Sequence, residues 1–138
     1  MEFKKILLPV IGTEADEETI KLACGLAKRY KSKVLSIYVI KIKRALPIDA
    51  EIESEIQKAE GILDFAEGVA EEQDYEIDTD VVQARDAGPA IIDEAVERGS
   101  NLILMGIKYK TRFGQFNLGH VVPYVLQNAP CPVILYQQ

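Results

Sequence analysis

The sequence predicts an α/β fold: a Rossmann-like, doubly wound, five-stranded parallel sheet with helices on both faces. Short apolar runs alternate along the chain with longer segments whose apolar residues recur at the spacing of an amphipathic helix. Most of the short runs are continuously apolar, as expected of strands buried on both faces. The 138 residues contain neither a linker nor an internal repeat, so we expect a single domain over residues 1–138.

The first half of the chain predicts two strands, each followed by a helix. Residues 6–10 form the first apolar run, and Gly12 breaks it. Thr13 is the expected N-cap of the first helix, because its hydroxyl can accept a backbone hydrogen bond and acidic residues follow it. Residues 34–40 form the second strand, and residues 41–50 connect it to a long helix. The apolar face of that helix consists of Ile56, Ala59, Leu63, Ala66 and Ala70.

The second half of the chain predicts three more strands and two helices. Apolar and charged residues alternate over residues 77–81, which is typical of a strand near a sheet edge. Residues 102–105 and 133–136 form two further apolar strands. Gly88-Pro89 opens the helix before the first of these strands, and Val121 begins the helix before the second. The expected buried face of the first of these helices consists of Ile91, Ile92, Ala95 and Val96, and the apolar positions that mark the second are Val121, Val122, Val125 and Leu126.

The alternation of strands and helices also predicts the sheet topology. Strands joined through helices are parallel, and right-handed crossovers give the strand order 3-2-1-4-5. The first and fourth strands then meet at the switch point, where ligands of such sheets bind outside the carboxyl ends of the strands. This rule singles out two turns, residues 10–13 after the first strand and Gly106–Gly119 after the fourth.

The segment Gly106–Gly119 has the features of an anion site. A glycine directly after a strand allows close approach to a ligand, and a glycine at a helix start leaves backbone N–H groups pointing outward. A solvated basic surface loop is the alternative interpretation. The basic residues expected at this end of the sheet are Lys41, Lys43, Arg44, Lys108, Lys110 and Arg112.

The net charge of −6 is unevenly distributed along the chain. Residues 1–97 carry a net charge of −10, whereas residues 98–138 hold four basic side chains and no Asp or Glu. Because an acidic chain repels nucleic acid, we expect no nucleic-acid partner. No apolar run has the length of a membrane span or the pattern of a signal peptide, so we expect a cytoplasmic protein without membrane insertion. Two cysteines and one histidine predict no disulfide framework and no metal site.

Four segments of the chain carry a family resemblance. They are Lys5-Ile-Leu-Leu-Pro-Val, Gly88-Pro-Ala-Ile-Ile-Asp-Glu-Ala, Asn101-Leu-Ile-Leu-Met-Gly followed by Gly119, and Asn128-Ala-Pro-Cys-Pro-Val-Ile-Leu. Together they resemble the universal stress protein family from end to end. The resemblance implies a cytoplasmic homodimer of Rossmann-like subunits. For many members it also implies a site for ATP or AMP, built on Gly-x-x-Gly, nine residues, and then Gly-Ser or Gly-Thr.

Matching this motif to the chain selects the residues of a ligand site. The resemblance implies an adenine pocket at Pro9, Val10 and Val39, beside the turn residue Ile11. The residues implied to meet the sugar and the phosphates are Met105, Gly106, Gly119, His120 and Val121, with Lys108 and Tyr109 in the intervening loop.

The sequence departs from the family's ATP-binding pattern at three positions. Ile11 replaces an acidic residue and cannot accept a hydrogen bond from a ribose. Tyr109 replaces the second glycine and adds bulk where phosphates would lie. His120 replaces Ser or Thr and offers a ring N–H, whose charged form a bound anion favours. We therefore expect ATP binding to be altered or lost.

Two functions follow from these residues. The first is a small regulatory domain that binds ATP, AMP or another phosphorylated ligand, with Lys108, Lys110, Arg112 and His120 complementing its phosphates. The alternative is a homodimeric module that binds no nucleotide and docks to a protein partner. No catalytic residues are predicted, because the chain has neither a Walker lysine pattern nor a nucleophile elbow.

The last predicted strand indicates how two copies of the chain pair. In the order 3-2-1-4-5 this strand, Val133–Tyr136, lies at a sheet edge and carries no charge. An apolar, uncharged edge favours pairing with another chain, and a two-fold dimer is its simplest closed form.

Overall fold

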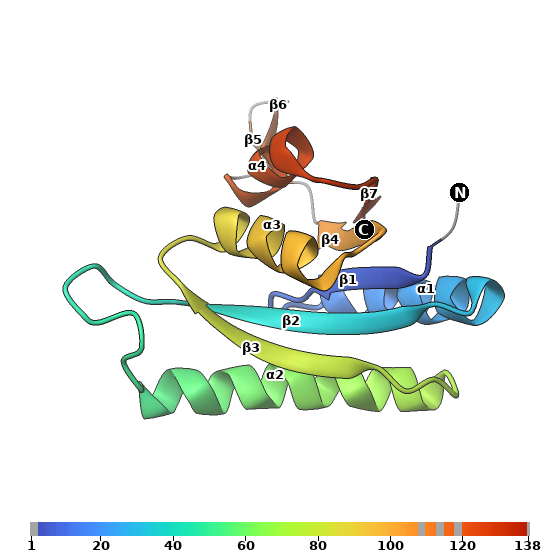
Figure 1. Ribbon diagram of the computed structural model, residues 1–138, viewed down its shortest axis with the longest axis horizontal. Coiled ribbons are helices and arrows are strands. Elements are labelled where there is room, and N and C mark those ends of the chain that lie inside the picture. Colours follow the sequence, from blue (N-terminus) through green and yellow to red (C-terminus); the bar gives the residue numbers. More distant parts are fainter. Residues whose placement is uncertain (1–2, 108–109, 113–114, 118–119, 138) are drawn as a thin grey trace.

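The structure, a computed structural model, describes residues 3–107, 110–112, 115–117 and 120–137. Its central sheet has the strand order β3-β2-β1-β4-β7, and every neighbouring pair in it is parallel. The predicted fold class and the predicted order 3-2-1-4-5 are therefore confirmed (Figure 1). The elements are β1 (Lys5–Pro9), α1 (Ala15–Tyr30), β2 (Lys33–Lys41), α2 (Glu53–Glu72), β3 (Asp78–Ala84), α3 (Ala87–Arg98), β4 (Leu102–Ile107), β5 (Lys110–Arg112), β6 (Gln115–Asn117), α4 (Val121–Asn128) and β7 (Val133–Gln137).

The sheet separates two layers of helices. Along β4, Leu102 and Leu104 pack into one buried cluster, whereas Ile103 and Met105 pack into another. This alternation follows from the two-residue period of a strand. Helices α1 and α2 contribute to the first cluster, and α3 and α4 contribute to the second. Each face of the sheet is thus covered by one pair of helices.

The segment Gly106–Gly119 differs from the predicted loop. Strand β4 continues through Gly106, which pairs with Tyr136, and ends at Ile107. Beyond it, β5 and β6 form a separate antiparallel pair with Thr111 opposite Phe116. The short polar strands of this pair lack the apolar alternation by which a strand is predicted from sequence.

Two further expectations are wrong in detail. Thr13 is not the N-cap of α1, which begins at Ala15 without a side-chain cap, because the Asp16 carboxylate binds the preceding turn instead. In α3, the apolar pattern predicts Val96 on the buried face, but it is 62% exposed. It follows the buried Ala95, and the apolar face that contacts the sheet is too narrow to include it.

Two features are absent from the described residues. No helix among them is both long enough and apolar enough to cross a bilayer. In the same part of the chain, no group of three or more His, Cys, Asp and Glu side chains could hold a metal ion.

Candidate functional site

A cavity of about 350 Å³ lies at the carboxyl ends of β1 and β4. These adjacent strands form the switch point of the sheet, because the chain proceeds from β1 to β2 on one side and from β4 to β7 on the other. The starts of α3 and α4 contribute Ala87 and Val121 to its wall. The lining residues are Pro9, Val10, Ile11, Ile37, Tyr38, Val39, Ala87, Ile91, Met105, Gly106, Ile107, Val121 and Val122.

The chemistry of the cavity is mainly that of aliphatic side chains. Ile37 is fully buried, and Ile91 and Met105 are almost fully buried, so they form a fixed apolar wall. Ile11 is 52% exposed and therefore lies at the rim. A concave apolar pocket of this size is complementary to a flat ring system and leaves polar recognition to backbone groups and to residues at the mouth.

The structure brings most of the predicted site residues together. Seven of the eleven line the cavity: Pro9, Val10, Ile11, Val39, Met105, Gly106 and Val121. His120 lies in an adjoining hollow. Lys108, Tyr109 and Gly119 lie outside the described residues. That these residues bind a ligand remains a prediction.

The adjoining hollow, of about 340 Å³, shares Ala87 and Val121 with the cavity. His120 stands there at the N-cap position of α4, its side chain making no capping hydrogen bond. Lys41, at the end of β2, and Asp86, before α3, also line this hollow. The rim on this side of the cavity therefore combines basic groups with one acidic residue.

The turn between β1 and α1 forms another wall, and sequence reasoning missed the residue that fixes it. The Asp16 carboxylate accepts hydrogen bonds from the N–H of Ile11 at 3.1 Å and of Gly12 at 2.7 Å. Burial raises the pKa of Asp16, while the N–H groups of Ile11, Gly12 and Thr13 oppose this by stabilising the charged form. Gly12 has a positive φ of 82°, a conformation that favours glycine, so the glycine in the sequence marks the turn but does not identify Asp16 as its partner.

Gly106 has a structural reason to be glycine. A Cβ atom at this position would lie 2.2 Å from the Thr19 hydroxyl oxygen and 2.9 Å from the Ala15 carbonyl oxygen. Thr19 itself donates a hydrogen bond to the Ala15 carbonyl at 2.8 Å, which fixes both atoms. The close approach predicted for Gly106 is thus an approach to helix α1.

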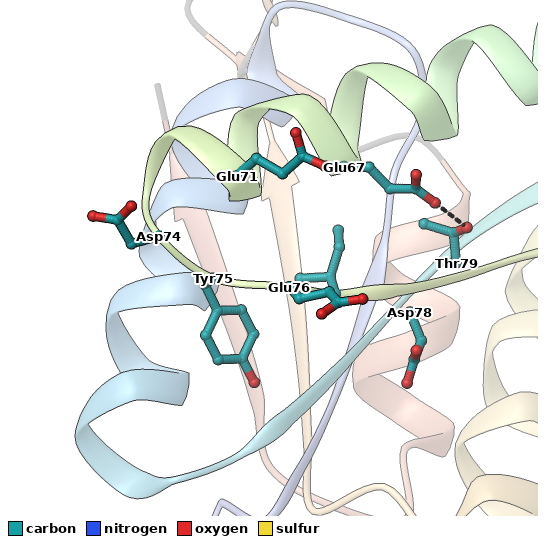
Figure 2. Close-up of a pocket in the computed structure, with 8 residues that line it drawn as sticks. Glu67, Glu71, Asp74, Tyr75, Glu76, Asp78 and Thr79 are labelled. Carbon is teal, nitrogen blue, oxygen red and sulfur yellow. Dashed lines mark hydrogen bonds between the residues drawn. The ribbon is translucent and has the colours of Figure 1, made fainter.

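A larger hollow, of about 830 Å³, lies far from the switch point, between the end of α2 and the start of β3 (Figure 2). In it Glu67 accepts a hydrogen bond from the Thr79 hydroxyl at 2.8 Å. The acidic residues that line this hollow are Glu67, Glu71, Asp74, Glu76 and Asp78. Because carboxylates dominate this lining and aliphatic side chains dominate the one at the switch point, the smaller cavity is the better candidate for a ligand site.

Comparison with known proteins agrees with the fold and the sequence motifs. The model of the universal stress protein family matches residues 2–137. A universal stress protein of Methanocaldococcus jannaschii is 32% identical over an alignment of 142 residues, gaps included. The alignment covers 99% of this chain and 83% of that protein.

Solved structures show the same fold. A universal stress protein from Archaeoglobus fulgidus aligns with a TM-score of 0.81 and 20% identity, covering 96% of this chain and 98% of that chain. The structure of the universal stress protein from Archaeoglobus fulgidus in complex with dAMP aligns with a TM-score of 0.77 and 21% identity, covering 98% of both chains. The family match over nearly the whole sequence and the 32% identical relative are decisive: the chain belongs to the universal stress protein family.

Proposed function

We propose that the chain is a small cytoplasmic regulatory domain that binds an adenine nucleotide in the cavity at the switch point. The observation that carries this proposal is the gathering of seven predicted site residues around one apolar cavity of about 350 Å³. The complex of an Archaeoglobus fulgidus relative with dAMP supports the ligand class. The adenine ring lies against the aliphatic wall, and the phosphate lies toward the rim.

AMP is the adenine nucleotide that this chain suits best. At position 11 an apolar side chain, 52% exposed, stands where the family pattern has an acid. In the sequence, Tyr109 and His120 replace two further groups that belong to the ATP-binding pattern. The loss at position 11 affects the ribose of AMP and ATP alike, but a ligand with one phosphate depends less on positions 109 and 120 than a triphosphate does, so AMP binds more tightly than ATP.

Calorimetric titration of the purified chain with AMP and ATP tests the proposal. Ala87→Leu adds bulk to the cavity wall and abolishes AMP binding, whereas Ala50→Leu, in the β2–α2 connection outside the cavity, leaves it unchanged. If wild-type protein binds neither nucleotide, the proposal fails and the alternative, a module that docks to protein partners, takes its place. If both variants bind AMP as wild type does, the ligand occupies another site.

We also propose that two copies pair through β7. Its residues Val133–Tyr136 carry no charge, and within the described sheet β7 pairs only with β4. The opposite edge strand, β3, carries Asp78 and Asp80 along its length. Charged side chains disfavour pairing at a sheet edge, so the uncharged edge is the one that favours a second copy.

A further inference from the structure

The turn between β1 and α1 is where a doubly wound sheet ordinarily receives a phosphate, because backbone N–H groups at the start of the helix point toward the ligand. In this chain the Asp16 carboxylate takes two N–H groups of the turn that leads into the helix. The Ile11 N–H contacts both carboxylate oxygens, at 3.1 and 3.2 Å, and the Gly12 N–H contacts one of them at 2.7 Å. A ligand that reached this turn would therefore find its donors already satisfied.

The carboxylate is a fixed part of the fold. Asp16 is only 5% exposed, although it belongs to the first turn of a helix whose neighbouring acids are exposed. On the other side of the turn, Ile62 covers Gly12 so closely that a Cβ atom there would lie 2.6 Å from its Cδ1. The turn is thus held between Asp16 and α2, and Asp16 cannot be displaced without opening it.

The charge around the turn reinforces this closure. Glu17 and Glu18 follow Asp16 in the first turn of α1, so a second anion would meet three carboxylates there. The same turn is one wall of the ligand cavity, through Val10 and Ile11. Asp16 itself lines a separate hollow against α2, whereas Lys41, at the end of β2, and His120, before α4, line the hollow that adjoins the cavity.

We propose that Asp16 is a specificity-determining residue of the ligand site, a resident anion that closes the β1–α1 turn to the phosphate of a ligand. This inference rests on the proposed nucleotide site and specifies which ligands that site accepts. The site binds ligands whose anionic group lies away from the β1–α1 turn. It rejects ligands that need a phosphate bound at that turn.

Titration with inorganic phosphate, followed through the backbone amide signals of 15N-labelled full-length chain, tests this assignment. In wild-type protein the Ile11 and Gly12 signals do not move. In Asp16→Ser, whose short side chain frees both N–H groups, they shift in a saturable way. Phosphate binds this variant at least about tenfold more tightly, as expected for a regained charge-assisted hydrogen bond. Glu17→Gln, which removes an exposed carboxylate from the same helix turn, leaves the two signals as in wild type.

Three outcomes overturn the assignment. The Ile11 and Gly12 signals shift equally in wild type and Asp16→Ser, they do not shift in folded Asp16→Ser, or they shift in Glu17→Gln as much as in Asp16→Ser. Should Asp16→Ser not fold, Asp16→Asn keeps the size of the side chain and removes the charge. Its two amide signals must then respond to phosphate more strongly than those of wild type, or the assignment is wrong. An AMP titration of wild-type protein separates the two proposals, because failure to bind AMP removes the nucleotide site and leaves the phosphate result at the turn valid.

Discussion

At the residue scale, Gly106 joins the ligand cavity to the packing of the fold. It lines the cavity, and its α-carbon lies against the first turns of α1, where Thr19 and Ala15 leave no room for a methyl group. We expect Gly106→Ala to lower the free energy of unfolding by about 1–3 kcal/mol, the usual cost of overpacking. Urea denaturation measures the change.

Gly25→Ala is the matched control for that substitution. Gly25 lies on the exposed side of α1, and a Cβ atom there would meet nothing within 4 Å. Alanine is the better helix former, so this variant gains about 0.5–1 kcal/mol. Equal stability of Gly106→Ala and wild type would show that α1 moves aside, and the packing explanation would then be wrong.

Cys24 provides a prediction about pH. Burial raises the pKa of its thiol, and the positive charge of Lys28 opposes this shift. Because the pKa is raised in the folded state, the stability it contributes is present in full below the unfolded value of about 9. That stability is lost as the pH rises through the folded value. Urea denaturation at several pH values from 7 to about 10 should therefore show a steeper loss of stability in wild type than in Cys24→Ala. Parallel curves for the two proteins would refute this.

At the element scale, the connection between β2 and α2 is held by two side chains from β3 and its end. Arg85 donates hydrogen bonds to the carbonyl oxygens of Lys43 and Leu46, at 2.6 and 2.8 Å. Gln83 donates to those of Ile48 and Ala50, at 2.9 and 3.0 Å. This connection projects from the sheet in Figure 1, so these hydrogen bonds determine where its basic residues lie.

Arg85→Ala should loosen that connection. We expect faster amide hydrogen exchange in residues 42–50 and a loss of about 0.5–1.5 kcal/mol, because two carbonyl groups of the connection lose their hydrogen-bond donor. Arg44→Ala is the control, since the exposed Arg44 side chain makes no hydrogen bond to any described residue, and its cost should stay below about 0.5 kcal/mol. If the two variants exchange alike, Arg85 does not hold the connection.

The elements also show which features a sequence can predict. Apolar runs such as residues 6–10 and 102–105 predict buried strands well, because only a parallel sheet covered on both faces accommodates several of them. The sequence alone does not predict that Asp16 fixes the β1–α1 turn. An acidic residue in the first turn of a helix also stabilises that helix when its side chain is exposed to solvent. Arg85 was likewise out of reach, because its hydrogen bonds join segments about 40 residues apart in the sequence.

The candidate site was predictable for a different reason. Pro9, Val39 and Met105 lie far apart in the sequence, and only the predicted strand order brings the ends of their strands to one edge. The sequence does not predict why position 106 is a glycine. A glycine at the end of a strand has the same sequence signature whether a ligand or a helix lies against it. Packing against α1 is visible only in three dimensions.

At the scale of the whole molecule, the two edges of the sheet predict how copies assemble. Tyr136→Lys places a charge on β7 and should convert a dimer into a folded monomer, measured by light scattering after size-exclusion chromatography. Gln57→Lys adds the same charge on α2, on the side of the sheet away from β7 in Figure 1, and should remain dimeric. A monomeric wild-type protein would contradict pairing through β7.

If the cavity at the switch point holds the adenine ring, AMP must contact the residues that line this cavity in the folded chain. The measurement is a titration of 15N-labelled wild-type protein with AMP, followed through its backbone amide signals. We predict saturable shifts centred on Val10, Val39 and Met105, which line the cavity. Saturable shifts confined to the acidic hollow around Tyr75 and Thr79, or no shifts at all, would contradict the claim.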